Sequence, residues 1–346
     1  MKQQKVTMQM IAETLQISKN SVSQALTGKD GVSEETRQLV IQTAEKLGYS
    51  YSETRKKKQT DRNRSIALIA SDFAFSRSFF GEIYLSIEQE CSKQGITLQI
   101  QSINPHAREN LILPSFLQNQ TVDGVLILSH ISTEYINTVL DTGIPTVLID
   151  HHHPHIHVDC ILINNRFGGY EAVHQLIKLG HKQIGFLGDI SFSPSYQERL
   201  EGYNLAMNEA GLTIHPEWLL KDVTEEAAEV TDKLSKMASL PTAWFCINDG
   251  LGFLLISSLQ QMGYKIPDDF SVCSFDNGQL SRINTPTTTT IAVDLSKYGQ
   301  KAFQQLLWRM NNPDEPYIEV HLPTTLIERE STKQRFEDDT NVAPDC

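Results

Sequence analysis

Apolar and polar positions follow two different patterns along the chain. Over residues 1–50, apolar side chains recur at helical spacing in three short stretches, the first at 8–15. Ser18 and Ser33 precede the second and third stretches, and serine is a favoured N-cap residue. The turn between the first two helices, Gln16-Ile17, gives them the spacing of a helix-turn-helix. The sequence therefore predicts an all-α helix-turn-helix domain of the DNA-binding type over 1–50, which we call the headpiece.

The second helix of this headpiece has two distinct faces. Ile17, Val22 and Leu26 can pack inward, and small Ala12 stands where the first two helices must approach closely. The opposite face is polar, as a surface that meets nucleic acid must be. It comprises Lys19, Asn20, Ser21, Ser23 and Gln24.

Residues 51–64 have the composition of a linker. They contain no aliphatic side chain and include the basic run Arg55-Lys56-Lys57-Lys58. Such a run can be a merely solvated hinge. Directly after a recognition fold, contact with DNA phosphates is the favoured interpretation.

From residue 66 onward, apolar runs alternate with amphipathic stretches. This alternation predicts an α/β sensor of two consecutive, doubly wound parallel-sheet lobes. Strands are expected at 66–70, 96–103, 122–128, 146–150, 161–164, 184–189, 243–249 and 271–276. Helices are expected at 79–93, 111–118, 134–141, 168–179, 197–210, 225–237, 252–262 and 296–310. Residues 332–346 are polar and are expected to form a disordered tail.

Composition narrows the class of protein. No apolar run approaches a membrane span, and no signal-peptide core follows the first residues, so a cytoplasmic protein is expected. Five scattered cysteines argue against disulfides or a zinc site, and no cofactor or metal is expected. Net charge is −12, yet residues 1–64 hold 12 Lys and Arg against 7 Asp and Glu, whereas the remainder holds 18 against 35. A basic head on an acidic body fits local binding to DNA.

Several expected strands end in polar side chains. Ligands of open α/β sheets bind beyond the carboxyl ends of the strands, so these residues mark a candidate site. They are Asp72, Asp150, Asn164, Asp189, Asn248, Asp249 and Asp276.

Many motifs together resemble the lac/gal repressor (LacI/GalR) family, over essentially the whole chain. The segment 6–49, from VTMQMIAETL to EKLGY, resembles the family's headpiece. The downstream motifs fall in the family's order: FFGEI (79–83), NNRFGGYEA (164–172), LGHKQIGFLG (179–188), ERLEGY (198–203), CIND (246–249), IPDDFSVCSFDN (266–277), PTTTTI (286–291) and LIERES (326–331).

The resemblance implies a periplasmic-binding-protein-like effector and dimerisation domain over 65–331. Lobe 1 would span about 65–163 plus 295–322, and lobe 2 about 164–292 plus 324–331. It also implies a homodimer on a pseudopalindromic double-stranded operator, a small-molecule effector (a sugar or sugar phosphate), and repression of carbohydrate-utilisation genes.

The resemblance further assigns roles to residues. In the headpiece, Lys19, Asn20 and Gln24 would read base edges, and Thr7, Ser18, Ser21 and Ser23 would anchor phosphates. In the cleft, carboxylates, amides and a guanidinium beside an aromatic wall suit sugar hydroxyls. The implied effector-binding residues are Phe79, Phe80, Asp150, Asn164, Ser195, Arg199, Asn248 and Asp276.

Some features depart from the family or leave alternatives open. Gln16 replaces the usual turn glycine, so a left-handed turn there is strained or the turn differs. The run His151-His152-His153-Pro154-His155-Ile156-His157 can be a metal site, a neighbour of the effector or a solvated loop, and the last is favoured. Phe79 and Phe80 can be core or ligand wall.

Two other classes of protein remain to be weighed. An enzyme with a basic appendage would need a catalytic motif, and the chain has no GxSxG elbow, P-loop or HExxH. A sugar-transport protein would need a signal peptide and would not carry the basic head. A ligand-controlled, non-enzymatic repressor is the favoured interpretation.

Overall fold

The structure is a computed structural model that describes residues 8–27, 31–47, 64–75, 78–129 and 131–336. The chain divides into two compact units, residues 1–64 and 65–346. Among the described residues, every helix is too short or too polar to cross a membrane.

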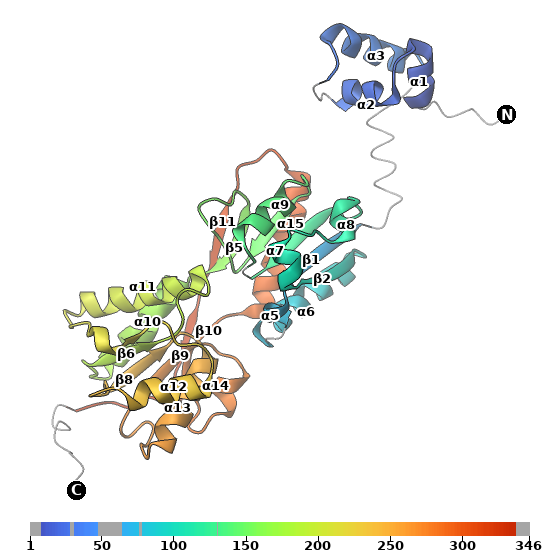
Figure 1. The fold of residues 1–346 in the computed structure, drawn as a ribbon. Helices are drawn as coiled ribbons and strands as arrows, with labels where there is room; N and C mark the ends of the chain where they lie inside the picture. The colour runs from blue at the N-terminus through green and yellow to red at the C-terminus, as the bar shows by residue number, and fades with distance from the viewer. Residues whose placement is uncertain (1–7, 28–30, 48–63, 76–77, 130, 337–346) are drawn as a thin grey trace. The chain divides into compact units, whose positions relative to one another are not determined.

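The first unit is a bundle of three short helices, α1 (Met8–Leu15), α2 (Lys19–Thr27) and α3 (Glu34–Lys46) (Figure 1). The predicted caps are confirmed: Ser18 Oγ accepts from Ser21 N at 2.9 Å, and Ser33 Oγ accepts from Thr36 N at 3.2 Å. The expected close approach of α1 and α2 at Ala12 is consistent with the structure, because Ala12 is buried. The core of the bundle comprises Ile11, Ala12, Val22, Ala25, Val40 and Ala44.

The turn between α1 and α2 is left-handed without a glycine. Gln16 has a φ of 53°, and Ile17 N donates to Ala12 O at 3.1 Å, which is the bond pattern of a Schellman C-cap. Of the two alternatives for this turn, the structure therefore shows the strained one.

The second unit holds two six-stranded sheets. The first has the order β11-β5-β4-β3-β1-β2 and is entirely parallel. Its strands are β1 (Ser65–Ser71), β2 (Thr97–Ile103), β3 (Gly124–Leu128), β4 (Thr146–Ile149), β5 (Asp159–Ile163) and β11 (Glu319–Leu322). The second has the order β12-β10-β9-β8-β6-β7, parallel except for β12. Its strands are β6 (Ile184–Leu187), β7 (Leu219–Leu220), β8 (Ala243–Cys246), β9 (Ser271–Asp276), β10 (Thr289–Ala292) and β12 (Thr325–Ile327).

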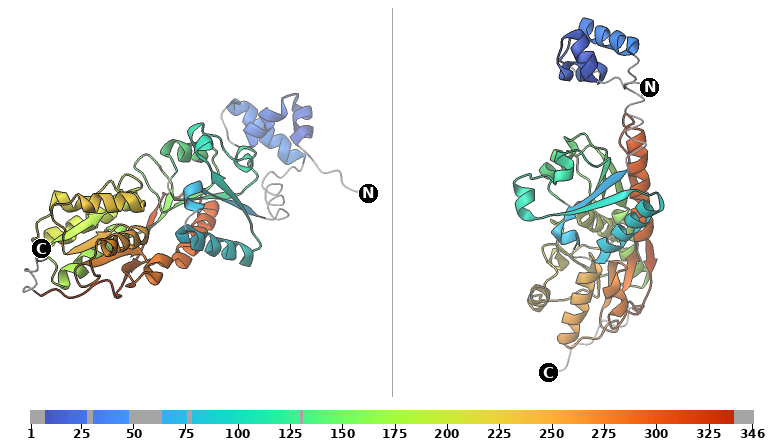
Figure 2. Two further views of the ribbon diagram at one scale, coloured as in Figure 1. Left: turned by 60° about the horizontal axis from the view of Figure 1, so that its bottom comes forward. Right: turned by 90° about the vertical axis from the view of Figure 1, so that its right-hand side faces the viewer.

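Helices cover both faces of each sheet, so both sheets are buried and doubly wound (Figures 1 and 2). The helices around the first sheet are α5 (Asp72–Phe75), α6 (Ser78–Lys93), α7 (Pro105–Glu109), α8 (Ser115–Gln118), α9 (Thr133–Leu140) and α15 (Leu295–Asn311). Those around the second are α10 (Asn165–Lys178), α11 (Pro194–Glu209), α12 (Ala227–Ser235), α13 (Asp249–Gln261) and α14 (Gln279–Ile283), with a 3-10 turn at Pro216–Trp218. We call these two layered bodies lobe 1 and lobe 2.

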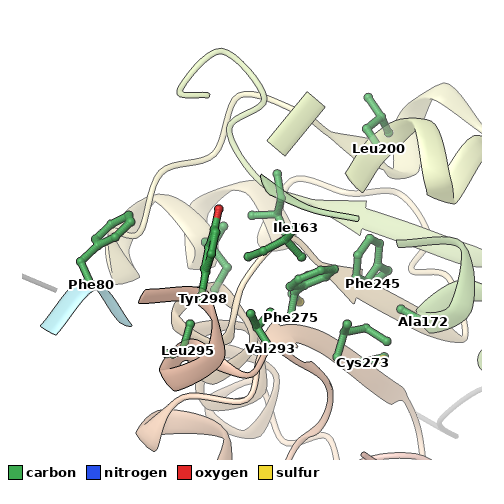
Figure 3. Packing of buried hydrophobic residues seen from close by; sticks show 14 of the residues in the cluster. Phe80, Ile163, Ala172, Leu200, Phe245, Cys273, Phe275, Val293, Leu295 and Tyr298 are labelled. Atoms are coloured by element: carbon green, nitrogen blue, oxygen red, sulfur yellow. The ribbon is translucent and has the colours of Figure 1, made fainter. Parts of the chain in front are cut away.

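The chain passes between the lobes three times, from β5 to α10, from β10 to α15, and from β11 to β12. One hydrophobic cluster accompanies these crossings. Figure 3 shows it running from Phe80 of lobe 1 past Tyr298 and Val293 to Phe275 and Phe245 of lobe 2. Within lobe 1, Tyr298 Oη donates to Ile161 O at 2.9 Å, which fixes the ring of Tyr298 in this cluster. The lobes therefore share a packed core at their junction.

Two expectations about the second unit are wrong. Of the helix expected at 111–118 only 115–118 forms, as α8, because Leu111 takes a φ of 53° and Pro114 stands at the N-cap of α8; the helix α7 at 105–109 was not expected. The tail is not disordered from residue 332. Lys333 N donates to Ser271 Oγ at 3.0 Å and Arg335 N donates to Leu179 O at 2.7 Å, so this segment is bound to lobe 2. Residues 337–346 lie outside the described residues.

We expect Gln16→Gly to stabilise the headpiece by about 1 kcal/mol, because glycine adopts a positive φ without strain. Native-state hydrogen exchange of α1 and α2 amides in the full-length protein measures this gain. Gln16→Ala is the matched control, since it shortens the side chain and keeps the strain. Equal protection in the two variants would contradict the prediction.

Candidate ligand-binding site

A cavity of about 780 Å³, part of it open to solvent, lies between the lobes where several strands end. Lobe 1 lines it with Phe79, Phe80, Ser129 and Asp150. Lobe 2 lines it with Phe192, Ser193, Tyr196, Arg199, Glu225, Asn248, Asp249, Gly250, Asp276, Gly278, Gln279 and Leu280. Its position matches the edge of the sheets at which the sequence predicted a ligand.

Strained backbone presents the strand-end side chains to this cavity. Ser129 follows β3 with a φ of 65°, and Asp150 follows β4 with a φ of 61°. In lobe 2, Asp276 ends β9 with a φ of 104°, and Asn277 follows with 55°. Non-glycine residues rarely adopt such angles, and strain of this kind concentrates at functional sites.

Arg199 is held rigidly in the floor of the cavity. Its side chain is 3% exposed. Nε donates to Asn165 Oδ1 at 3.0 Å, Nη1 donates to Ile247 O at 2.7 Å, and Nη2 lies 3.2 Å from Asp276 Oδ1. The guanidinium carbon lies 3.7 Å from the centre of the Phe275 ring. Contacts from α10, β9 and the end of β8 therefore fix the position of this charge.

The carboxyl groups around Arg199 are desolvated. Burial raises the pKa of Asp276 to about 8 and that of Asp150 to about 6, although Arg199 favours the charged form of both. Asp150 Oδ1 accepts from Ser195 Oγ at 3.2 Å. Asp276 Oδ1 is buried, and its contact with Arg199 lacks the geometry of a hydrogen bond. A ligand with hydroxyl groups could satisfy this atom.

Asn248 and Asp249 shape the lobe 2 side. Asn248 Oδ1 caps α13 by accepting from Leu251 N at 2.9 Å, and its Nδ2 donates to Glu225 Oε1 and to Tyr196 Oη, both at 2.8 Å. Asp249 accepts from Thr290 Oγ1 at 2.8 Å and from Gly278 N at 2.5 Å. Asp249 thus ties the start of α13 to β10 and to the loop after β9.

The structure brings six of the eight effector candidates into one cavity wall, namely Phe79, Phe80, Asp150, Arg199, Asn248 and Asp276. Their role toward an effector stays a prediction. Asn164 is not in the wall, because its Oδ1 caps α10 by accepting from Phe167 N at 3.3 Å. Ser195 is not in the wall either; it is buried, and its Oγ donates to Asp150 Oδ1 at 3.2 Å.

Sequence reasoning missed Phe192, Tyr196 and Glu225. Phe192 precedes α11 and Tyr196 lies in its first turn, four residues on, and their rings lie 5.6 Å apart. Aromatic side chains at this spacing after a strand were the available signal. Glu225 gave none, because it lies in an irregular segment that only the tertiary structure brings to the cavity.

The histidine run is not simply a solvated loop. His151 is 2% exposed, and His152 Nε2 lies 2.8 Å from Glu198 Oε1 on α11. The hydrogen bond with Glu198 raises the pKa of His152. Among the described residues, no group of three or more His, Cys, Asp or Glu could hold a metal ion.

The predicted DNA-binding residues are placed only in part. Lys19 is exposed, Ser18 Oγ and Ser21 Oγ lie 2.8 Å apart, and Ser23 and Gln24 are half-buried. The Gln24 amide occupies the space that a side chain at Gly31 would need. The Asn20 side chain, Thr7 and the run Arg55, Lys56, Lys57 and Lys58 lie outside the described residues.

Comparisons with known proteins agree with this architecture. The family model of a periplasmic binding protein-like domain matches residues 173–332. The HTH-type transcriptional repressor PurR of Pasteurella multocida is 31% identical over 337 residues, which cover 95% of this chain and 99% of that protein. The ribose operon repressor of Haemophilus influenzae is 31% identical over 328 residues, with coverages of 94% and 98%. The solved transcriptional regulator CelR–cellobiose complex matches with a TM-score of 0.70 at 25% identity, covering 94% of this chain and 100% of that chain.

The second unit is therefore a two-lobed sensor of the periplasmic-binding-protein kind, joined to a helix-turn-helix. The chain belongs to the LacI family of transcriptional regulators.

The titration of Asp276 has a measurable consequence for stability. Its folded pKa of about 8 lies above its unfolded value, so the folded state binds more protons between about pH 4 and 8, and stability falls as pH rises through this range. We expect Asp276→Asn to raise the free energy of unfolding at pH 8 by about 1–3 kcal/mol, and not at pH 4.

Denaturant unfolding at both pH values tests this. Asp150→Asn is the companion variant, and its gain should be complete by about pH 6 because the pKa of Asp150 is about 6. A loss of stability for Asp276→Asn at pH 8 would instead show an ionised Asp276 that stabilises Arg199.

Proposed function

We propose that this regulator is a cytoplasmic, non-enzymatic repressor of carbohydrate-utilisation genes. It binds a pseudopalindromic operator as a homodimer, and a sugar bound between the lobes controls its operator affinity. The observation that carries the proposal is the cavity to which both lobes contribute polar groups around Arg199. Its repressor relatives and the cellobiose complex of CelR support the assignment.

The chemistry of the cavity favours a neutral sugar over a sugar phosphate. Asp150, Glu225, Asp249 and Asp276 all line it, whereas Arg199 is the only basic side chain among the described lining residues. A phosphate would meet this excess of carboxyl groups at low dielectric. Sugar hydroxyls can donate to the carboxyl oxygens and accept from Asn248, and the rings of Phe79 and Phe192 can pack on apolar sugar faces.

Control follows from the position of the cavity. A ligand that contacts both lobes favours the arrangement in which the lobes hold it, and it shifts the equilibrium by its difference in affinity between arrangements. The three crossings of the chain join the lobes, so a change in how the lobes are arranged has to be accommodated at these crossings.

A gel-shift experiment on DNA from upstream of the gene, with and without neutral sugars, tests the proposal. We expect a shifted complex whose stability changes with one sugar and not with its phosphate ester. An enzyme would bind no DNA and would convert the sugar, and a pure transport protein would bind the sugar without binding DNA. Either result would overturn the proposal.

We expect Arg199→Ala to lower sugar affinity about tenfold to a hundredfold, because it removes a buried charged donor. Operator affinity without sugar should be retained. Arg166→Ala is the matched control, since Arg166 is exposed and pairs with Glu201 at 2.7 Å outside the cavity wall. Calorimetry on proteins with verified folding gives the affinities, and unchanged binding by Arg199→Ala would remove Arg199 from the site.

For the headpiece, we expect Gln24→Ala to relax preference at one base pair of each half-site by about 1–3 kcal/mol. Lys56→Ala should weaken binding to all sequences alike and lower the salt slope by about one unit. Binding to an operator library at several salt concentrations separates base reading from phosphate contact. The same pattern for both variants would show that this division of roles is wrong.

A further inference from the structure

Lobe 2 contains a second compartment beside the cavity between the lobes. It has a volume of about 610 Å³, part of it open to solvent. The compartment shares Phe192, Tyr196, Glu225 and Asn248 with the first cavity. These four residues therefore form a partition with one face toward each space.

The partition is polar along one edge and aromatic along the other. Asn248 is 5% exposed, and its Nδ2 donates to Tyr196 Oη and Glu225 Oε1 at 2.8 Å. The rings of Phe192 and Tyr196 lie 5.6 Å apart and are tilted by 36°. A ligand that extends from one space to the other would therefore meet hydrogen-bonding groups along one edge of the partition and aromatic ring surface along the other.

The remaining walls of the compartment suit a hydroxyl-rich ring. Val223 and Leu251 supply apolar surface, and Asp189, Thr224 and Glu226 supply oxygen atoms. Asp189 Oδ1 already accepts from Ser191 Oγ at 2.6 Å, which fixes its carboxyl group. Acceptor oxygens opposite apolar surface match a sugar ring, whose hydroxyls donate at its edge and whose C–H faces are apolar.

We propose that the effector is a neutral saccharide of two rings, with one ring between the lobes and the second in the lobe 2 compartment behind Phe192 and Tyr196. This inference rests on the proposed function of the cavity. The compartment is lined by lobe 2 alone, so the second ring adds affinity and selectivity without contacting lobe 1. The first ring, which both lobes contact, produces the response.

Calorimetry and gel shift with paired neutral sugars test the proposal: glucose against cellobiose and maltose, and galactose against lactose. With the full-length protein, we expect one disaccharide to bind at least about tenfold more tightly than its own monosaccharide, as one or two added hydrogen bonds would give. At saturating concentrations, the monosaccharide and the disaccharide should change the operator affinity in the same direction and to the same extent.

Thr224→Trp fills the compartment from an exposed wall position. In this variant the disaccharide should bind about as tightly as its monosaccharide, and the affinity for the monosaccharide should be unchanged. Thr224→Val is the matched control, because it removes the hydroxyl that donates to Glu229 and adds no bulk, and it should keep the preference.

Each outcome supports or overturns a specific statement. Equal affinity for mono- and disaccharide, or an equal loss of both in Thr224→Trp, overturns the second-ring site while the proposed function stands. An aryl glucoside that binds more tightly than every disaccharide overturns the assignment of a hydroxyl-rich ring. Failure of all these sugars to change operator binding rejects the proposed function and this inference with it.

Discussion

The buried guanidinium of Arg199 organises the site. A cation removed from water is stable only where acceptors and opposite charge surround it; here Asn165 and Ile247 accept its hydrogen bonds, and Asp276 Oδ1 lies 3.2 Å from it. These residues begin α10, follow β8 and end β9, three elements that fold correctly only together. The positive φ of Asp276 and Asn277 persists because this network and Arg329, which donates to Thr288 O at 2.8 Å behind the loop, hold the chain there.

The same network reaches across to lobe 1. Asn165 Nδ2 donates to Glu198 Oε2 at 3.2 Å, and the other oxygen of Glu198 lies 2.8 Å from His152 Nε2 in the loop after β4. Glu198 and Arg199 are neighbours on α11, so one turn of helix faces both the junction of the lobes and the ligand cavity. A change in how the lobes meet therefore alters the surroundings of Arg199 directly, and no long chain of contacts is needed between them.

The sequence predicted the elements whose patterning is local and strong. Long apolar runs such as that of β1 and β9 marked the central strands, and serine caps marked the headpiece helices. The strands β7 and β12 were missed because they have two and three residues, and β10 and β11 were missed because their sequences, TTIA and EVHL, lack the apolar runs that marked the equally short β4, β6 and β8. Asn164 and Ser195 have side chains suited to a ligand, yet helix capping and Asp150 occupy them. Glu225 and the bound segment after Ser331 depend on tertiary contacts that no local pattern records.

The order of the strands has a consequence for how the chain folds while it is being synthesised. The headpiece occupies the first residues, makes its own core, and can fold as soon as it leaves the ribosome. Lobe 1 must wait for α15 and β11, and lobe 2 must wait for β12 and for Ser331, whose Oγ donates to Val272 O at 2.6 Å. Neither sheet is complete until nearly the whole chain has been synthesised. During synthesis, the DNA-binding headpiece can thus be folded well before the sensor that controls it is complete.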